Sequence, residues 1–280
     1  MEINYRAYQE QDQEVILQML DEFHLRPSSL EYCLRRFPQN GLVAIEGDRL
    51  VGCGFHGEAD PEGRAMCQVF VHPDARRRRI GSTLLWRLQE RMTQQGIRKL
   101  ICDFEKNPAE IAFAEVKGLV PYFASRYMSY GGERCPVEAM PVEPYRDEDY
   151  EEVQKLVSEA FYQMQQKAGF PNPVPEPPSE QQRREYLDNA SHLFVYRQQG
   201  EIIGFVSLDE DEIDCIAVRV DKQGQGIGKK LLLFATNELF SRGYQKIYLW
   251  VVVGNPAIRL YHRMQWVVES THIFAGKELL

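Results

Sequence analysis

Residues 216–232 read Ile-Ala-Val-Arg-Val-Asp-Lys-Gln-Gly-Gln-Gly-Ile-Gly-Lys-Lys-Leu-Leu. The pattern from Lys229 onward is typical of a helix, and the apolar run before the glycines predicts a strand that ends with Ile216, Ala217 and Val218. A strand that enters a glycine-rich turn and then a helix gathers several backbone N–H groups, and the positive end of the helix dipole, around one point. The stretch therefore predicts a binding site for a pyrophosphate.

The spacing of the glycines decides which kind of pyrophosphate loop this is. They lie at Gly224, Gly226 and Gly228, whereas the dinucleotide fingerprint needs glycines at its first, third and sixth positions. The loop of nucleoside triphosphatases needs four residues between its glycines and then Lys-Ser or Lys-Thr, which are absent here. The pattern Gln/Arg-x-x-Gly-x-Gly/Ala does fit, and through Gln223 the loop resembles the acetyl-CoA loop of the GNAT acetyltransferases. The resemblance implies acetyl-CoA as co-substrate and no metal.

A second block strengthens this resemblance. Residues 255–266, Asn-Pro-Ala-Ile-Arg-Leu-Tyr-His-Arg-Met-Gln-Trp, are similar to the family's Asn-x-x-Ala-x-x-Leu-Tyr-x-x-x-Gly-Phe. The departures include Gln265 for glycine, so a side chain must reach the turn conformation without glycine's freedom. In the family the pantetheine arm lies between two strands that splay apart. The resemblance implies a cofactor site made of Ile216, Ala217, Val218, Gln223, Gly224, Gln225, Gly226, Ile227, Gly228, Lys229 and Asn255.

The chemistry of acetyl transfer suggests two catalytic residues. The enzyme must align two substrates, deprotonate an amine, stabilise an oxyanion and protonate the departing thiolate. Tyr261 occupies the family's acid position, and an amide at Ile216 to Val218 is the expected oxyanion donor. Glu212 lies where the histone-acetyltransferase branch carries its basic glutamate, and strand alternation predicts Glu212, Asp214 and Ile216 on one face. The acidic stretch 209–212 is also typical of a solvated hairpin tip, so Glu212, Asp214 or a water chain remain open as the base.

The same chain carries an earlier and altered copy of both blocks. Val71 aligns with Val218 and Gly81 with Gly228 at an offset of 147, and Asn107 aligns with Asn255 at 148. At this alignment Ala65 replaces Glu212, Phe113 replaces Tyr261 and Arg79 replaces Gly226. Tyr8 and Asp12 similarly resemble Tyr145 and Asp149. The copy lacks the base, the acid and the open backbone, so we expect it not to catalyse, although its arginines 76–79 leave weak CoA binding open.

The predicted fold class is therefore α/β with mixed α+β character, as two tandem GNAT modules. Each is a mixed, mostly antiparallel sheet flanked by helices, with a splayed central pair of strands. The glycine and proline cluster at 131–136 predicts a boundary between a degenerate N-terminal module, 1–135, and a catalytic C-terminal module, 136–280. Each half is large enough for its own core. The five prolines within 169–178 predict a stiff loop, which in this family commonly covers the acceptor pocket.

The composition and net charge limit the classes of partner that the protein is expected to bind. The 280 residues carry a net charge of −8, which argues against a general nucleic-acid binder, whose phosphate contacts call for a basic face. The six cysteines are scattered, as in a reducing cytoplasm, and neither a leader nor a membrane-spanning run is apparent. We expect a cytoplasmic N-acetyltransferase that acts on a primary amine of a small-molecule or amino-acid-like acceptor. A monomer is compatible with two modules that mimic a dimer.

Other functions remain open at this point. One is a non-catalytic acyl-CoA sensor, which would bind acetyl-CoA but release no thiol. Others are a protein or peptide N-acetyltransferase and an enzyme that uses both modules or longer acyl groups.

Overall fold

A computed structural model describes residues 2–23, 29–134, 140–170 and 174–279. The chain divides into two compact units, of which the first comprises Met1–Tyr122 and Ile273–Leu280 and the second Phe123–His272. Two strands, β6 (Val120–Tyr130) and β12 (Val267–Glu278), each contribute residues to both units. The units therefore differ in extent from the contiguous halves expected from the sequence. The expected boundary itself, at 135/136, lies outside the described residues and stays a prediction.

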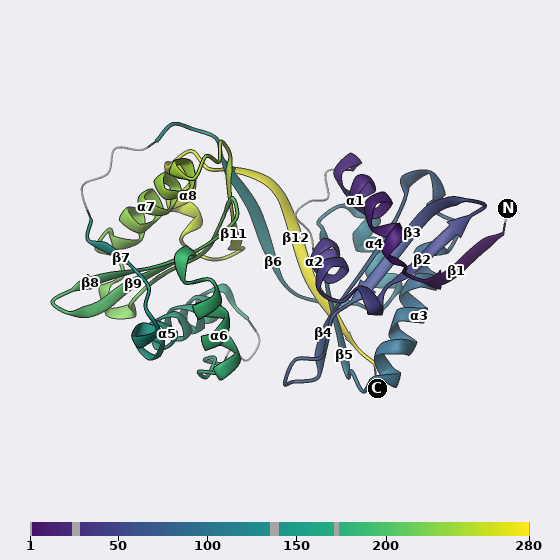
Figure 1. Cartoon of the computed structure of the whole chain (residues 1–280), viewed down its shortest axis with the longest axis horizontal. Coiled ribbons are helices and arrows are strands. Elements are labelled where there is room, and N and C mark those ends of the chain that lie inside the picture. The colour runs from purple at the N-terminus through teal and green to yellow at the C-terminus, as the bar shows by residue number, and fades with distance from the viewer. Residues whose placement is uncertain (1, 24–28, 135–139, 171–173, 280) are drawn as a thin grey trace. The chain divides into compact units, whose positions relative to one another are not determined.

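Unit 1 is a mixed sheet with helices on both faces (Figure 1). Its strands occur in the order β1-β2-β3-β4-β5, followed by the last residues of β12, and β4 pairs with β5 in parallel. Packing of α3 forms one core, which includes Leu84 and Leu88, while α1 and α2 form the other around Ile16 and Leu34. The elements are β1 (Ile3–Ala7), α1 (Gln13–Glu22), α2 (Ser29–Arg36), β2 (Leu42–Glu46), β3 (Arg49–His56), β4 (Arg64–Val71), α3 (Ile80–Gln94), β5 (Lys99–Glu105) and α4 (Pro108–Val116).

Unit 2 repeats this arrangement. Its strands occur in the order β6-β11-β10-β9-β8-β7, with the first part of β12 beside β6, and β10 pairs with β11 in parallel. One core forms where α7 packs on the sheet and the other where α5 packs on the opposite face. The elements are β7 (Val142–Pro144), α5 (Tyr150–Ala168), α6 (Glu180–Asp188), β8 (Leu193–Gln198), β9 (Glu201–Asp209), β10 (Glu212–Val218), α7 (Ile227–Ser241), β11 (Ile247–Val252) and α8 (Ile258–Arg263).

The central parallel pair of each sheet splays apart, as expected. In unit 2 the pairing of β10 with β11 covers only Glu212 with Tyr248 and Ile213 with Leu249. In unit 1 the pairing of β4 with β5 covers only residues 64–66 of β4. From Asp214 onward, β10 has a ladder partner only on its β9 edge. Backbone amides on the other edge are therefore available to a ligand.

Two local predictions about the loops are confirmed and one about a strand is wrong. The described part of the proline-rich segment is neither helix nor strand, and Gln154 of α5 donates a hydrogen bond to the carbonyl of Glu176 at 2.6 Å. Gln265 adopts a φ of +64°, the conformation that glycine usually supplies. The expected alternation of Glu212, Asp214 and Ile216 on one face fails, because β10 shifts register between Ile213 and Cys215. Ile216 instead packs with Ile213 in the α7 core.

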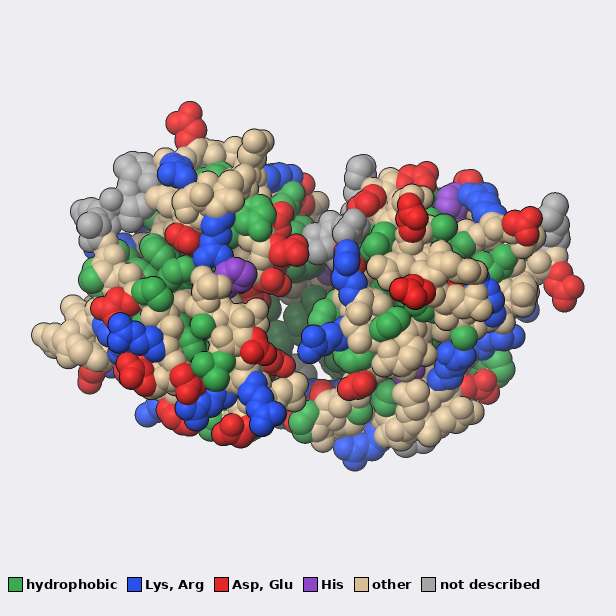
Figure 2. Space-filling view, viewed as in Figure 1, with side chains coloured by type: hydrophobic (Ala, Val, Ile, Leu, Met, Phe, Trp, Pro, Cys, Tyr) green, Lys and Arg blue, Asp and Glu red, His purple; other side chains and the backbone are tan. Residues whose placement is uncertain are grey.

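The surface is charged and mixed. On the face in view in Figure 2, acidic and basic side chains are interspersed. No helix in the part of the chain that the structure describes is both long and apolar enough to cross a membrane.

Candidate functional site

The loop before α7 has the backbone conformation of an anion-binding turn. Gly224 and Gly226 have φ values of +77° and +83°, and Gly226 is the N-cap of α7. No side chain caps this helix, so its first amides are not used by the protein's own side chains. The Gln223 side chain donates to the Val218 carbonyl at 3.1 Å, which ties the turn back to β10. The loop therefore presents open backbone N–H groups at a positive helix end, as a pyrophosphate requires.

The space beside the two glycines is empty of protein. A β-carbon placed on either Gly224 or Gly226 would have no protein atom within 4 Å. The surrounding residues are exposed, including Gln225 and Lys229, while Ile227 is buried and anchors the start of α7. A ligand of the size of a pyrophosphate thus has access to the loop, and the donor groups present fit its charge.

The same backbone turn occurs in unit 1, although its residues differ. Arg77 and Arg79 have φ values of +64° and +65°, at the positions that align with Gly224 and Gly226. The Arg76 side chain donates to the Val71 carbonyl at 3.0 Å, as Gln223 does to Val218. Arg78 forms a bidentate ion pair with Glu46. Two of the four arginines are thus held by protein groups, and the other two occupy a strained conformation that costs of order 1 to 3 kcal/mol each.

Glu212 starts β10, next to Tyr248 of β11. Burial raises the pKa of Glu212 to about 8, and the negative charges of Asp214, Asp209 and Asp211 add to this effect. The carboxyl group is therefore poised to exchange a proton near neutral pH. Asp214 is exposed, and its carboxylate accepts a hydrogen bond from Ser207 at 2.8 Å.

Tyr261 lies on α8, where its ring centroid is 6.2 Å from that of Trp266. Burial raises the pKa of Tyr261 to about 12. The ordinary pKa of a tyrosine hydroxyl is near 10. At the higher value Tyr261 keeps its proton at any physiological pH, so it can donate a hydrogen bond to a developing thiolate.

The Asn255 side-chain oxygen accepts a hydrogen bond from the Ala257 amide at 2.9 Å, which closes a turn before α8, whose N-cap is Ala257. Asn107, in contrast, is the N-cap of α4 and accepts a hydrogen bond from the Glu110 amide at 3.0 Å. The strand residues expected to carry the oxyanion donor lie on the free edge of β10, where Ala217 is buried while Ile216 and Val218 are partly buried.

Unit 1 lacks the reacting groups at the matching positions. Ala65 is buried with 2% exposure, and Phe113 is 38% exposed beneath Lys117. Neither side chain can exchange a proton. Among the aligned positions, only those of unit 2 carry the candidate acid, the candidate base and the glycines of the loop.

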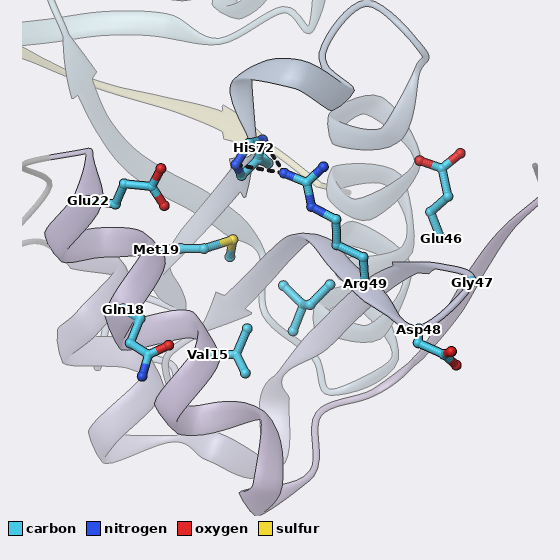
Figure 3. Close-up of a pocket in the computed structure, with 10 residues that line it drawn as sticks. Val15, Gln18, Met19, Glu22, Glu46, Gly47, Asp48, Arg49 and His72 are labelled. Carbon is cyan, nitrogen blue, oxygen red and sulfur yellow. Dashed lines mark hydrogen bonds between the residues drawn. The ribbon is translucent and has the colours of Figure 1, made fainter.

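Unit 1 instead has an open groove of about 800 Å³ on its α1 side. Figure 3 shows Val15, Met19 and Glu22 of α1 on one side and the β2–β3 turn on the other, with Arg49 hydrogen-bonded to His72. The alignment of Asp12 with Asp149 places Glu152 of unit 2 at the position of Val15. The Glu152 carboxylate accepts a hydrogen bond from the Ile202 amide at 2.7 Å. The groove is thus distinct from the candidate site, none of whose residues line it.

The chain matches the model of the Acetyltransferase (GNAT) family twice, over residues 3–118 and 151–266. The chain belongs to this family. It is 28% identical to a mycothiol acetyltransferase of Thermomonospora curvata, over 82% of this chain and 80% of that one. It is 26% identical to a mycothiol acetyltransferase of Saccharomonospora viridis, over 76% and 74%.

Solved structures show the same tandem GNAT fold. A GCN5-related N-acetyltransferase from Sphaerobacter thermophilus superposes with a TM-score of 0.76 at 18% identity, covering 99% of this chain and 96% of that one. A tandem GNAT protein from the clavulanic acid biosynthesis pathway gives 0.70 at 18% identity, covering 100% and 99%. The chain is thus a two-domain GNAT acyltransferase, from a family that uses acetyl-CoA.

Sequence reasoning missed one member of the site's surroundings. Tyr127 of β6 lies on the same sheet face as Glu212, and its hydroxyl is buried. No motif marks it, because its neighbours on β11 are about 120 residues away along the chain. Among the described residues, no group of three or more His, Cys, Asp or Glu side chains is arranged to hold a metal ion.

Proposed function

We propose that this GNAT protein transfers the acetyl group of acetyl-CoA to a primary amine of a small-molecule or amino-acid-like acceptor, and that unit 2 carries out the chemistry. The observation that carries this proposal is the presence of Glu212, Tyr261 and the open loop at Gly226 in unit 2, set against Ala65, Phe113 and Arg79 in unit 1. Relatives named as mycothiol acetyltransferases support a small acceptor over a protein.

Acetyl-CoA supplies the thioester, and residues of unit 2 hold it. Amides from Gln225 to Lys229 bind the pyrophosphate, with Gly224 and Gln223 shaping the loop. The free edge of β10 at Ile216, Ala217 and Val218 receives the pantetheine arm and donates an amide to the oxyanion. Alignment by fixed backbone groups lowers the barrier because the donors need no reorganisation during the reaction.

Glu212 is the base of the proposed mechanism. A lysine-like amine with a pKa near 10.4 costs about 4.6 kcal/mol to neutralise at pH 7, whereas an α-amine near 7.8 costs about 1 kcal/mol. A carboxylate whose pKa is about 8 takes a proton from an α-amine almost without cost. This match favours an α-amine or a similarly weakly basic amine as the acceptor group.

Tyr261 stabilises the departing thiolate in the proposed mechanism. A cysteine-like thiol has a pKa of about 8.5, well below that of Tyr261, so the hydroxyl stabilises the thiolate chiefly by donating a hydrogen bond. The coenzyme A thiol then takes its proton from this site or from water.

The proposal is tested by incubating the purified full-length protein with acetyl-CoA and a panel of primary amines. Release of free thiol that depends on the amine, together with a product heavier by one acetyl group, is expected. Acetyl-CoA binding without thiol release for any amine would support the sensor alternative instead. Activity that survives Gly226→Glu but not Arg79→Glu would place the chemistry in unit 1.

A further inference from the structure

The Tyr127 hydroxyl is buried and has no hydrogen-bond partner among the described residues. Its ring contacts two others on β11: the centroid of Tyr248 lies 5.0 Å away with the planes 2° apart, and that of Trp250 lies 4.7 Å away. These contacts restrict the orientation of the side chain. A buried polar group without a partner destabilises the fold. An unpaired buried hydroxyl in a native structure therefore calls for an explanation.

Tyr127 and Glu212 share one face of the unit 2 sheet. Met128 belongs to the α7 core, so its neighbour Tyr127 points to the opposite face. Ile213 also belongs to that core, which places Glu212 on the same face as Tyr127. The two residues lie on strands separated by β11, where Tyr127 is opposite Trp250 and Glu212 is opposite Tyr248. Two strand spacings and two residues of rise put their backbones about 12 Å apart, which a tyrosine and a glutamate reaching diagonally toward each other can span. Burial raises the pKa of Tyr127, and the charge of Glu212 raises it further, as expected for neighbours.

Among the described residues, the other charged groups that act on Glu212 or its neighbours are already paired or carry a negative charge. The groups that face it or its neighbours from the surrounding elements are Asp209 of β9, Asp211 of the β9–β10 turn, Asp214 of β10, Tyr248 of β11, Tyr127 of β6, Tyr186 of α6, and Glu269 of β12 with its partner Lys246. The three aspartates repel the carboxylate. Lys246 is paired with Glu269 at 2.7 Å and lies over the Tyr248 ring, and Ser207 donates to Asp214.

We propose that the Tyr127 hydroxyl donates a hydrogen bond to the Glu212 carboxylate once Glu212 ionises, either directly or through one water. Tyr127 is thereby a positioning residue, which fixes the orientation of the base. No proton is transferred in this contact, because the hydroxyl keeps its own. The inference rests on the role of Glu212 as base in the proposed function. The hydrogen bond between Tyr127 and Glu212 can nevertheless be measured without turnover.

The test is a carboxyl titration by NMR of the full-length protein labelled with 13C at the glutamate side-chain carboxyl. Glu212→Gln identifies the resonance by removing it. Loss of a hydrogen bond to a charged group should raise the pKa of Glu212 by about one unit in Tyr127→Phe. Tyr248→Phe is the matched control, since it removes a hydroxyl from the neighbouring ring, and should leave the pKa of Glu212 unchanged. No shift in Tyr127→Phe, or equal shifts in both variants, would overturn the proposal.

A second measurement covers the case in which Tyr127→Phe does not fold. In the wild-type protein labelled with 13C at the tyrosine ring carbon that bears the hydroxyl, the Tyr127 signal should move at the pH where Glu212 ionises. That step should disappear in Glu212→Gln. A Tyr127 signal that ignores the ionisation of Glu212 would contradict the contact. Both titrations can be carried out without an acceptor or turnover. A negative result in them would therefore contradict the contact alone, whereas absence of acetylation would contradict the proposed function.

Discussion

Replacing Gly226 by glutamate tests the pyrophosphate loop at the point where ligand and backbone should meet. The residue is the N-cap of α7 with a φ of +83°, and a β-carbon there has no protein atom within 4 Å. Protein packing therefore leaves room for the new side chain. Any clash or repulsion that it causes must come from the ligand.

The expected loss can be sized. A carboxylate about 4 Å from a phosphate charge is repelled by roughly 4 kcal/mol at an effective dielectric constant of 20, equivalent to almost a thousandfold in Kd. The left-handed backbone adds about 1 to 2 kcal/mol of strain, which lowers the stability of the fold. Acetyl-CoA affinity should thus fall far more than stability.

Gly226→Arg is the matched control, since it imposes the same backbone strain with the opposite charge. Its natural counterpart, Arg79, already adopts a φ of +65° in unit 1. Acetyl-CoA binding measured by calorimetry should be abolished in the glutamate variant and weakened less in the arginine variant, which crowds the loop without repelling the phosphate, with similar losses in Tm. Equal loss of binding in both variants would refute the electrostatic argument. Unchanged affinity in a folded glutamate variant would refute the assignment of the loop.

Three further outcomes follow from the other named residues. Tyr261→Phe should lower kcat about tenfold or more with little change in acetyl-CoA affinity, whereas equal losses in both would indicate a packing role. Because the carboxyl of Glu212 is neutral below its pKa of about 8, kcat at saturating amine should rise with pH up to about 8, and this rise should vanish in Glu212→Gln. Gln265→Gly should raise the stability to unfolding in urea by roughly 1 kcal/mol, because it relieves a φ of +64°, whereas Arg263→Gly in α8 should lower it.

The sequence predicts the parts of the site that depend on local backbone chemistry. Glycines at 224, 226 and 228 before a helical pattern specify the turn by their conformational freedom alone, and the structure confirms positive φ at Gly224 and Gly226. The alignment with Arg77 and Arg79 also holds at the level of backbone angles. The conformational freedom of glycine could not predict that Arg77 and Arg79 adopt the same turn without it.

Features that depend on long-range pairing could not be predicted. The register shift between Ile213 and Cys215 moves Ile216 to the other face, and a bulge of this kind leaves no mark in a pattern of alternating residues. Tyr127 reaches the surroundings of Glu212 only because β6 pairs with β11. The assignment of Ile273–Leu280 to unit 1 likewise depends on where the last strand pairs.

The number of tight acetyl-CoA sites per chain tests the central claim most directly. Calorimetric titration of the full-length protein should give one tight site per chain, which Gly226→Glu removes and Arg79→Glu leaves intact. A second, weaker site at the arginines of unit 1 is compatible with the account if raised salt removes it, since exposed charge contacts fade with ionic strength. Two equally tight sites, or one tight site that only Arg79→Glu removes, would contradict the placement of acetyl-CoA and its chemistry in unit 2.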